Sequence, residues 1–233
     1  MKILAVGAHP DDIEILCAGT LAKYAQKGHI VTMAHTCQGD KGHFEIPADE
    51  LSRIRRREAA DSASVIGAES IGLGMNDLEL YADRHATLKV VELIRRTKPD
   101  IILTHDPNDY MPDHTVTSKL VFDASFIATL PHTKTGHPHH DKVTPIYYMD
   151  TLAGVAFEPE EYVDISGTIQ VKREMLGRHA SQIEWLRNHD GIEIIDFMET
   201  VARFRGLQCG APFAEGFRRS HRWPRNPTIR HLP

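Results

Sequence analysis

The sequence predicts an α/β protein in which helices cover both faces of a mostly parallel sheet, giving three layers. Two observations support this fold class. Apolar segments of strand length alternate with segments of helical periodicity through the first half of the chain. Several strand-like segments are apolar at nearly every position, which is typical of strands buried on both faces. The alternation implies right-handed crossovers between parallel neighbours.

Four strand–helix pairs are expected in the first half of the chain. Gly28 follows the first helix and is a common C-terminal stop, and Pro99 ends the third. Apolar residues at helical spacing mark the second helix. The expected strands are residues 2–8, 30–36, 69–74 and 100–106, and the expected helices are residues 17–27, 48–66, 86–99 and 113–130.

The second half of the chain is less regular. A long polar loop at 131–145 precedes a short apolar strand. The elements expected in this half are strands at 145–150 and 162–166 and helices at 167–186 and 192–205. From about residue 218 to residue 233 the sequence has five arginines and no acidic residue. This predicts a solvated tail, or an arm that packs on a neighbouring subunit or borders an anionic site.

Length and composition favour a single domain, residues 1–233, and argue against several classes of protein. The formal net charge of −5 gives no basic excess for nucleic-acid binding. No apolar run approaches the ~20 residues that a transmembrane helix needs. Three distant cysteines without a CxxC motif fit a reducing compartment, so a cytoplasmic protein is expected. The oligomeric state is left open, with a homo-oligomer among the alternatives.

The first strand ends in a cluster of polar side chains. His9, Pro10, Asp11 and Asp12 follow it directly, in the stretch "GAHPDD". Sites in open parallel sheets form beyond the carboxyl ends of the strands. A dinucleotide-binding protein carries a glycine-rich turn there, so these side chains argue against a nucleotide site. Adjacent aspartates repel each other unless a cation lies nearby, which favours a metal site.

A second polar cluster, "THDPNDYMPDH", follows the strand at 100–106. If the two clusters meet, His9, Asp12 and His114 would supply two imidazoles and one carboxylate. This set suits zinc and leaves a position for water, although iron(II) takes the same ligands. Asp11 would remain free beside that water as a general base.

Together these motifs resemble the LmbE/PIG-L family of zinc-dependent N-deacetylases. The pairing of "AHPDD" with a downstream "PDH" is specific, and the resemblance covers nearly the whole chain. The shared features are "AHPDD", "AGT" at 18–20, the R-x-x-E spacing of Arg55 and Glu58, "PDH" at 112–114, "RHASQ" at 178–182 and "AEGFRR" at 214–219.

The resemblance implies a Rossmann-like fold and removal of an acetyl group from an N-acetylglucosamine-type sugar or conjugate. It implies that His9, Asp12 and His114 hold zinc. Asp11 would be the general base, and Arg55 would contact the substrate sugar.

One position departs from the family pattern. Many relatives have a histidine that stabilises the oxyanion where this chain has Met111, whose thioether cannot donate a hydrogen bond. We therefore expect a substitute donor, unless zinc alone polarises the carbonyl. The candidates are Tyr110, His105, His137, His139 and His140.

Structural roles compete with the catalytic ones at several positions. Asp11 could cap a helix, and Asp113 could either orient a ligand or cap a helix. Arg55 and Glu58 could form a surface ion pair. For the whole protein, the alternatives are a nucleotide-dependent enzyme and a non-catalytic metal- or sugar-binding module. Substrate specificity is expected to reside in the loops 39–47, 106–113 and 131–145.

Overall fold

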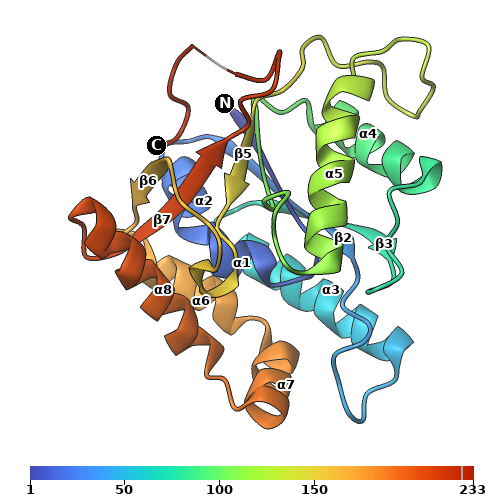
Figure 1. Ribbon diagram of the computed structural model, residues 1–233. Coiled ribbons are helices and arrows are strands. Elements are labelled where there is room, and N and C mark those ends of the chain that lie inside the picture. The colour runs from blue at the N-terminus through green and yellow to red at the C-terminus, as the bar shows by residue number, and fades with distance from the viewer. Residues whose placement is uncertain (227) are drawn as a thin grey trace.

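The computed structural model describes residues 1–226 and 228–233, and the strands in this part of the chain form one seven-stranded sheet (Figure 1). The strands are β1 (Lys2–Gly7), β2 (Ile30–Cys37), β3 (Glu69–Met75), β4 (Ile101–Thr104), β5 (Ile146–Met149), β6 (Glu161–Asp164) and β7 (Ala214–Arg219). Their order across the sheet is β3-β2-β1-β4-β5-β7-β6. β3, β2, β1, β4 and β5 pair in parallel, whereas β7 is antiparallel to both of its neighbours.

Helices cover both faces of this sheet. They are α1 (Asp12–Leu16), α2 (Ala18–Gln26), α3 (Ala48–Ser64), α4 (Arg84–Thr97), α5 (Pro112–Ile127), α6 (Ile169–Gly177), α7 (Ala180–Asp190), α8 (Ile194–Cys209) and the short 3-10 helix η1 (Leu152–Gly154). Along β1, Ile3 and Ala5 pack in the core beneath α1, α2, α6 and α8. Leu4 and Val6 pack in the core beneath α4 and α5. The predicted three-layer fold with a mostly parallel sheet is confirmed.

The segment expected as one helix at 167–186 forms two helices, α6 and α7. The backbone leaves helical geometry at His179, with φ −86° and ψ 59°. Glu58 of α3 accepts hydrogen bonds from the backbone N–H and the hydroxyl of Ser181, at 2.8 and 2.6 Å. The expectation of one helix is therefore wrong, because a tertiary contact that apolar periodicity does not reveal ties the first turn of α7 to α3.

The sequence pattern does not predict β7, which takes Arg218 and Arg219 from the expected tail. Beyond it, the Arg225 guanidinium lies 3.9 Å from the centroid of the Phe122 ring and donates to Ser125 Oγ at 2.9 Å. The expectation of a solvated tail is wrong for these arginines, because they belong to the sheet or bind side chains of their own chain. The intersubunit arm stays a prediction.

The parallel strands define two edges of the sheet. The carboxyl ends of β3, β2, β1 and β4 meet at one edge, which we call the carboxyl edge. The loop 131–145 joins α5 to β5 and lies at the opposite, amino edge. There His140 donates its backbone N–H to Ala128 O at 2.9 Å, and its Nε2 lies 3.3 Å from Pro99 O, just before β4.

Candidate functional site

Neighbouring strands each place a side chain of a metal-binding type at the carboxyl edge. Because parallel strands end at the same edge, residues that are distant in sequence become neighbours there. The side chains are His9 and Asp12 after β1, Cys37 at the end of β2, Asp77 after β3, His105 after β4 and His114 in the first turn of α5.

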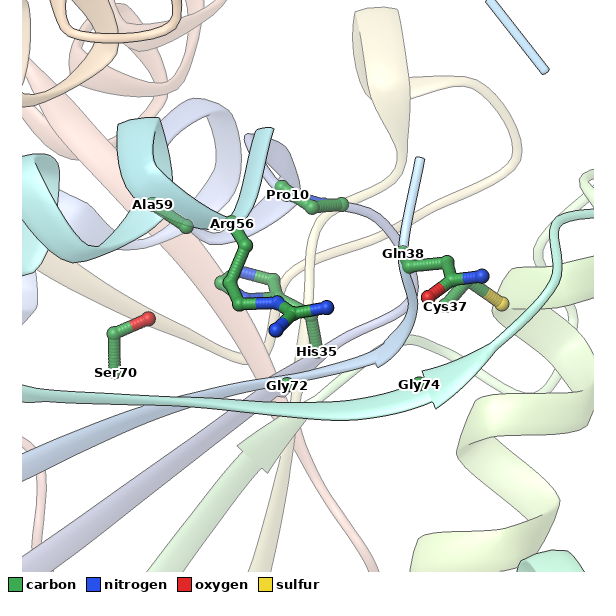
Figure 2. A pocket seen from close by; sticks show the side chains of 9 residues that line it. All are labelled: Pro10, His35, Cys37, Gln38, Arg56, Ala59, Ser70, Gly72 and Gly74. Atoms are coloured by element: carbon green, nitrogen blue, oxygen red, sulfur yellow. The ribbon is translucent and has the colours of Figure 1, made fainter. Parts of the chain in front are cut away.

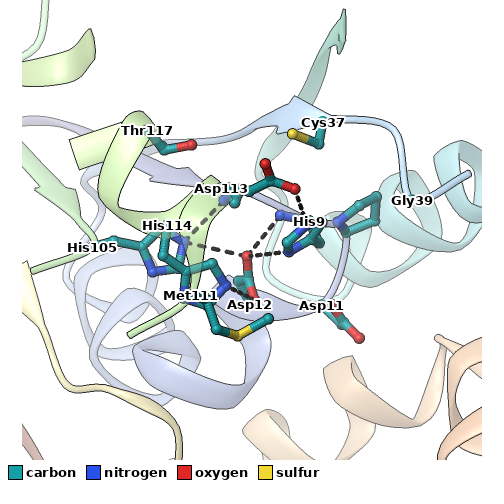
Figure 3. Close-up of polar contacts among 12 residues, drawn as sticks. His9, Asp11, Asp12, Cys37, Gly39, His105, Met111, Asp113, His114 and Thr117 are labelled. Carbon is teal, nitrogen blue, oxygen red and sulfur yellow. Dashed lines mark hydrogen bonds and ion pairs between the residues drawn. The ribbon is translucent and has the colours of Figure 1, made fainter. Parts of the chain in front are cut away.

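His9, Asp12 and His114 converge at this edge (Figure 3). Their potential ligand atoms all lie within 4.8 Å of one another. Asp12 Oδ1 lies 3.3 Å from His114 Nε2, and Asp12 Oδ2 lies 3.5 Å from His9 Nδ1. The backbone N–H of His9 donates to Asp12 Oδ2 at 2.6 Å and fixes the carboxylate. The structure thus brings together the three residues that the sequence indicates as metal ligands.

Two further carboxylates orient the two imidazoles. Asp109 Oδ2 lies 2.9 Å from His114 Nδ1, and Asp113 Oδ2 lies 3.0 Å from His9 Nε2. When these nitrogens donate, the other nitrogen of each ring turns its lone pair toward Asp12. Asp113 lies inside α5, beyond the N-cap position, so it does not cap this helix. Of its two expected roles, it has the one of orienting a ligand, His9.

This arrangement fits a metal ion. Among the described residues, the buried His114 Nε2 has no hydrogen-bond partner. Burial lowers the pKa of His9, but Asp113 and Asp12 outweigh this effect and raise that pKa to about 10. At His114 burial again lowers the pKa, but Asp12 and Asp109 outweigh this effect and raise that pKa to about 9. The cluster therefore favours added positive charge, and two imidazoles with one carboxylate suit a zinc ion.

Asp11 stands beside this cluster. Its backbone has a φ of 126°, a region that residues other than glycine rarely adopt. Within the described chain its side chain makes no capping hydrogen bond to α1, so the capping alternative is wrong. Its Oδ1 lies 3.2 Å from Arg55 Nη2. Burial raises the pKa of Asp11 to about 6, and the Arg55 guanidinium opposes this rise.

Arg55 is buried beneath the turn that carries Asp11, with its side chain only 4% exposed. It donates hydrogen bonds to the carbonyl oxygens of Pro10 and Gly39. Glu58, its expected ion-pair partner, binds the start of α7 instead. The surface ion-pair alternative is therefore wrong, while the contact of Arg55 with a sugar stays a prediction.

The candidate oxyanion donors separate into two groups. His105 is fully buried and its ring stacks on that of His114, with 3.8 Å between centroids. Tyr110 is exposed in the loop before α5, next to Met111. The other three lie in the amino-edge loop: His137, His139 and His140. Loop 131–145 lies at the opposite edge from the site of its own chain, so these three histidines drop out as donors there, and the expectation that this loop sets the specificity of that site is wrong.

A buried polar group near Asp11 is not apparent from the sequence. Glu14 accepts a hydrogen bond from the Ser62 hydroxyl at 2.6 Å and lies 3.1 Å from His179 Nε2. Burial raises the pKa of Glu14, but His179 outweighs it and lowers that pKa to about 2. The motif "RHASQ" singles out His179, yet no spacing connects it to a glutamate so far away in the sequence.

A cavity of about 220 Å³ lies beside the site, between α3 and the strands β2 and β3 (Figure 2). Gly72 and Gly74 of β3 have no side chains to fill this space. His35 lines it from β2, and burial lowers the pKa of this imidazole to about 4. The remaining lining residues are Pro10, Cys37, Gln38, Arg56, Ala59 and Ser70.

The chain is similar to several known proteins over much of its length. The family model for GlcNAc-PI de-N-acetylase, called PIG-L, matches residues 4–125. The diacetylchitobiose deacetylase of Thermococcus kodakarensis is 30% identical over 230 residues, which cover 93% of this chain and 82% of that protein. The 4-oxalmesaconate hydratase of Pseudomonas putida is 27% identical over 169 residues, covering 68% of this chain and 61% of that protein.

A solved structure has the same fold. The N,N'-diacetylchitobiose deacetylase of Pyrococcus horikoshii, in complex with an inhibitor, superposes with a TM-score of 0.82. It is 27% identical, and the match covers 94% of this chain and 83% of that one. In the described part of the present chain, no helix is both long enough and apolar enough to cross a membrane.

Proposed function

The chain belongs to the GlcNAc-PI de-N-acetylase (PIG-L, LmbE) family, and from this we propose that it is a zinc-dependent N-deacetylase. Its substrate would be a small N-acetylglucosamine-type sugar or conjugate. Two deacetylases of N,N'-diacetylchitobiose among the similar proteins support this substrate class.

One observation carries the proposal. His9, Asp12 and His114 present converging donor atoms, while the adjacent Asp11 is not needed as a ligand. A purely structural cluster has no need for a further carboxylate held in a strained backbone conformation. We assign His9, Asp12 and His114 as the metal ligands and Asp11 as the general base.

The chain's own residues divide the reaction between them. A metal held by His9, Asp12 and His114 would supply Lewis-acid activation of water and of the acetyl carbonyl. Asp11 takes the proton from the attacking water, and a bond forms between the water oxygen and the carbonyl carbon. The amide C–N bond then breaks, and Asp11 returns the proton to the leaving nitrogen. The products are acetate and a free amine.

Other residues tune this chemistry. Arg55 holds Asp11 and the turn around it, and we retain a sugar contact as part of its proposed role. His105 and Tyr110 are the remaining candidates for the donor that Met111 cannot provide. The loops 39–47 and 106–113 follow β2 and β4, so they lie at the edge where a substrate would enter.

A second candidate function is the addition of water to an unsaturated carboxylic acid. The 27% identity to the hydratase of Pseudomonas putida favours it. The same groups could activate water for attack on a carbon–carbon double bond. The two candidates differ in what they release, because only a deacetylase produces a free amine.

The test is a panel assay on the purified protein after metal analysis. We expect about one equivalent of zinc or iron(II) and amine release from N-acetylglucosamine conjugates. Loss of the ultraviolet absorbance of a conjugated unsaturated acid, without amine release from any conjugate, would favour the hydratase. Nucleotide retained through purification would favour the nucleotide-dependent alternative, and unchanged function in Asp11→Asn would favour a binding module.

A further inference from the structure

His9 faces a second group of metal-binding side chains, which we call the thiol group: Cys37, Asp77 and His9 itself. A ring nitrogen of His9, the Cys37 Sγ and a carboxylate oxygen of Asp77 lie within 4.8 Å of one another. Figure 3 shows Cys37 on the other side of the His9 ring from Asp12. Cys37 is 1% exposed and Asp77 is 6% exposed, whereas the His9 side chain is 15% exposed, so a cation can reach the group past His9.

Backbone contacts hold the members of the thiol group in place. The N–H of Cys37 donates to Ala8 O at 2.8 Å, which ties the end of β2 to the turn that carries His9. Gly39 N–H donates to Asp77 Oδ1 at 2.8 Å. The arrangement follows from the sheet order, because β1 lies between β4 on one side and β2 and β3 on the other.

We propose that His9, Cys37 and Asp77 form a second metal site, which takes zinc or another thiophilic divalent cation. Thiolate, imidazole and carboxylate are all zinc ligands, and the thiolate favours soft cations over magnesium or calcium. When the cation binds, the Cys37 thiol releases its proton to solvent and a metal–sulfur bond forms. No oxidant or reductant is required.

The two sites share one imidazole and therefore compete for it. A neutral imidazole offers a single lone pair, since its other nitrogen carries a proton. His9 points Nδ1 at Asp12 and Nε2 at Asp113, so it serves one metal at a time. A second cation bound by the thiol group withdraws His9 from Asp12 and His114. This inhibition rests on the proposed function, whereas the metal binding does not.

Cadmium titration tests the binding directly, because a cadmium–thiolate bond gives a charge-transfer band in the ultraviolet. The chain with Cys209→Ser, which removes the exposed cysteine, is titrated both metal-free and after addition of one equivalent of Zn²⁺. We expect the band in both titrations. Adding Cys37→Ser or Cys37→Ala should abolish it, and adding Cys17→Ala, at another buried cysteine, should preserve it.

Two results would overturn the site: no band in the chain that retains Cys37, or a band that survives Cys37→Ala. Either one would leave Cys37 as a small apolar residue that only packs. Two cysteine substitutions are used so that a folding defect in one, judged by thermal melting, does not decide the outcome.

The competition for His9 has its own readout. Excess Zn²⁺ should lower the rate of deacetylation by the wild-type chain by ~10-fold or more, the size of effect expected when a ligand is disturbed. Cys37→Ser should keep the basal rate and resist the excess zinc. Equal inhibition of both chains would overturn the competition. If no form releases amine while the band follows Cys37, the proposed function fails and the metal site stands.

Discussion

Histidines at the two edges of the sheet differ sharply, although they look alike in the sequence. At the carboxyl edge His105 and His114 are fully buried, and His9 is held by two carboxylates. At the amino edge His137 and His139 are exposed, and the buried His140 places its Nε2 3.3 Å from the backbone oxygen of Pro99. The first group follows the carboxyl ends of strands, whereas the second lies in a connection from a helix to a strand. The position of a histidine relative to a strand end therefore decides its chemistry.

Removing a ligand at the carboxyl edge should give the largest effect. We expect His9→Ala, Asp12→Ala and His114→Ala each to lose most bound metal, and activity to fall by more than the ~10–100-fold typical of changes to groups that merely support ligands. Metal analysis by mass spectrometry and an amine-release assay measure this. Stoichiometric metal in all three variants would refute the ligand assignment.

Asp11→Asn should separate chemistry from metal binding at the same edge. The amide has nearly the same shape but cannot accept the proton, so activity should fall by on the order of 10²-fold or more while the metal remains. Steady-state kinetics and metal content are measured together. Asp61→Asn, on the exposed face of α3, is the control, and near-normal turnover of Asp11→Asn would remove Asp11 from the mechanism.

Asp109→Asn probes how the carboxyl edge orients its ligands. Asp109 contacts His114 Nδ1 at 2.9 Å, so its loss should weaken metal affinity by ~10–100-fold without removing a ligand. Competition with a chelator of known affinity measures the change. Asp123→Asn, farther along α5 and paired with Lys119, should leave the affinity unchanged. A similar loss of metal affinity in both variants would point to damage to helix α5 instead.

His35, near the carboxyl end of β2, should make the free energy of unfolding depend on pH. In the unfolded chain the imidazole has a pKa near 6.5, whereas burial in the folded protein lowers the pKa of His35 to about 4. Between these values the unfolded state binds more protons, so stability falls as pH falls. From pH 7 to pH 5 this residue should remove about 2 kcal/mol of unfolding free energy.

Urea denaturation across this pH range measures the slope. His35→Gln should flatten it, because glutamine does not titrate. His139→Gln, at an exposed position of the amino edge, is the matched control for loss of a histidine. An unaltered slope in His35→Gln would mean that the imidazole takes up its proton at the same pH in the folded and unfolded states.

Substitutions at the amino edge should have the smallest effect. His137→Ala, His139→Ala and His140→Ala should leave kcat/KM and metal content unchanged, because their loop lies at the opposite edge from His9. A loss of activity without metal loss would contradict the claim that the amino-edge histidines have no part in the site. It would mean that this loop reaches the site of a neighbouring subunit.

Much of the fold could be predicted because its central strands are buried on both faces. Most positions of residues 2–8 and 30–36 are apolar, and β1 and β2 are buried at every position but the first, so the pattern places both strands within a residue or two. The break at His179 and strand β7 could not be predicted. Each depends on a partner distant in sequence, Glu58 in one case and the flanking strands in the other.

The candidate site was predictable to the extent that topology fixes it. Two polar segments at the ends of parallel strands must meet, which brings His9 and Asp12 to His114. The orienting contact of Asp109 depends on the path of a loop, which no periodicity encodes. The error over loop 131–145 is of another kind, since a loop that leads from a helix into a parallel strand enters at the amino edge.

Strand β7 has a consequence for synthesis of the protein. It lies between β5 and β6, yet it is the last of the seven strands to leave the ribosome. Until then the nascent chain exposes unpaired backbone N–H and C=O groups along the sides of β5 and β6, and strands of other chains can pair with such groups. A chain cut short before Ala214 would keep the metal-binding residues and lack the strand that closes this gap. Such a fragment should need a chaperone and aggregate without one.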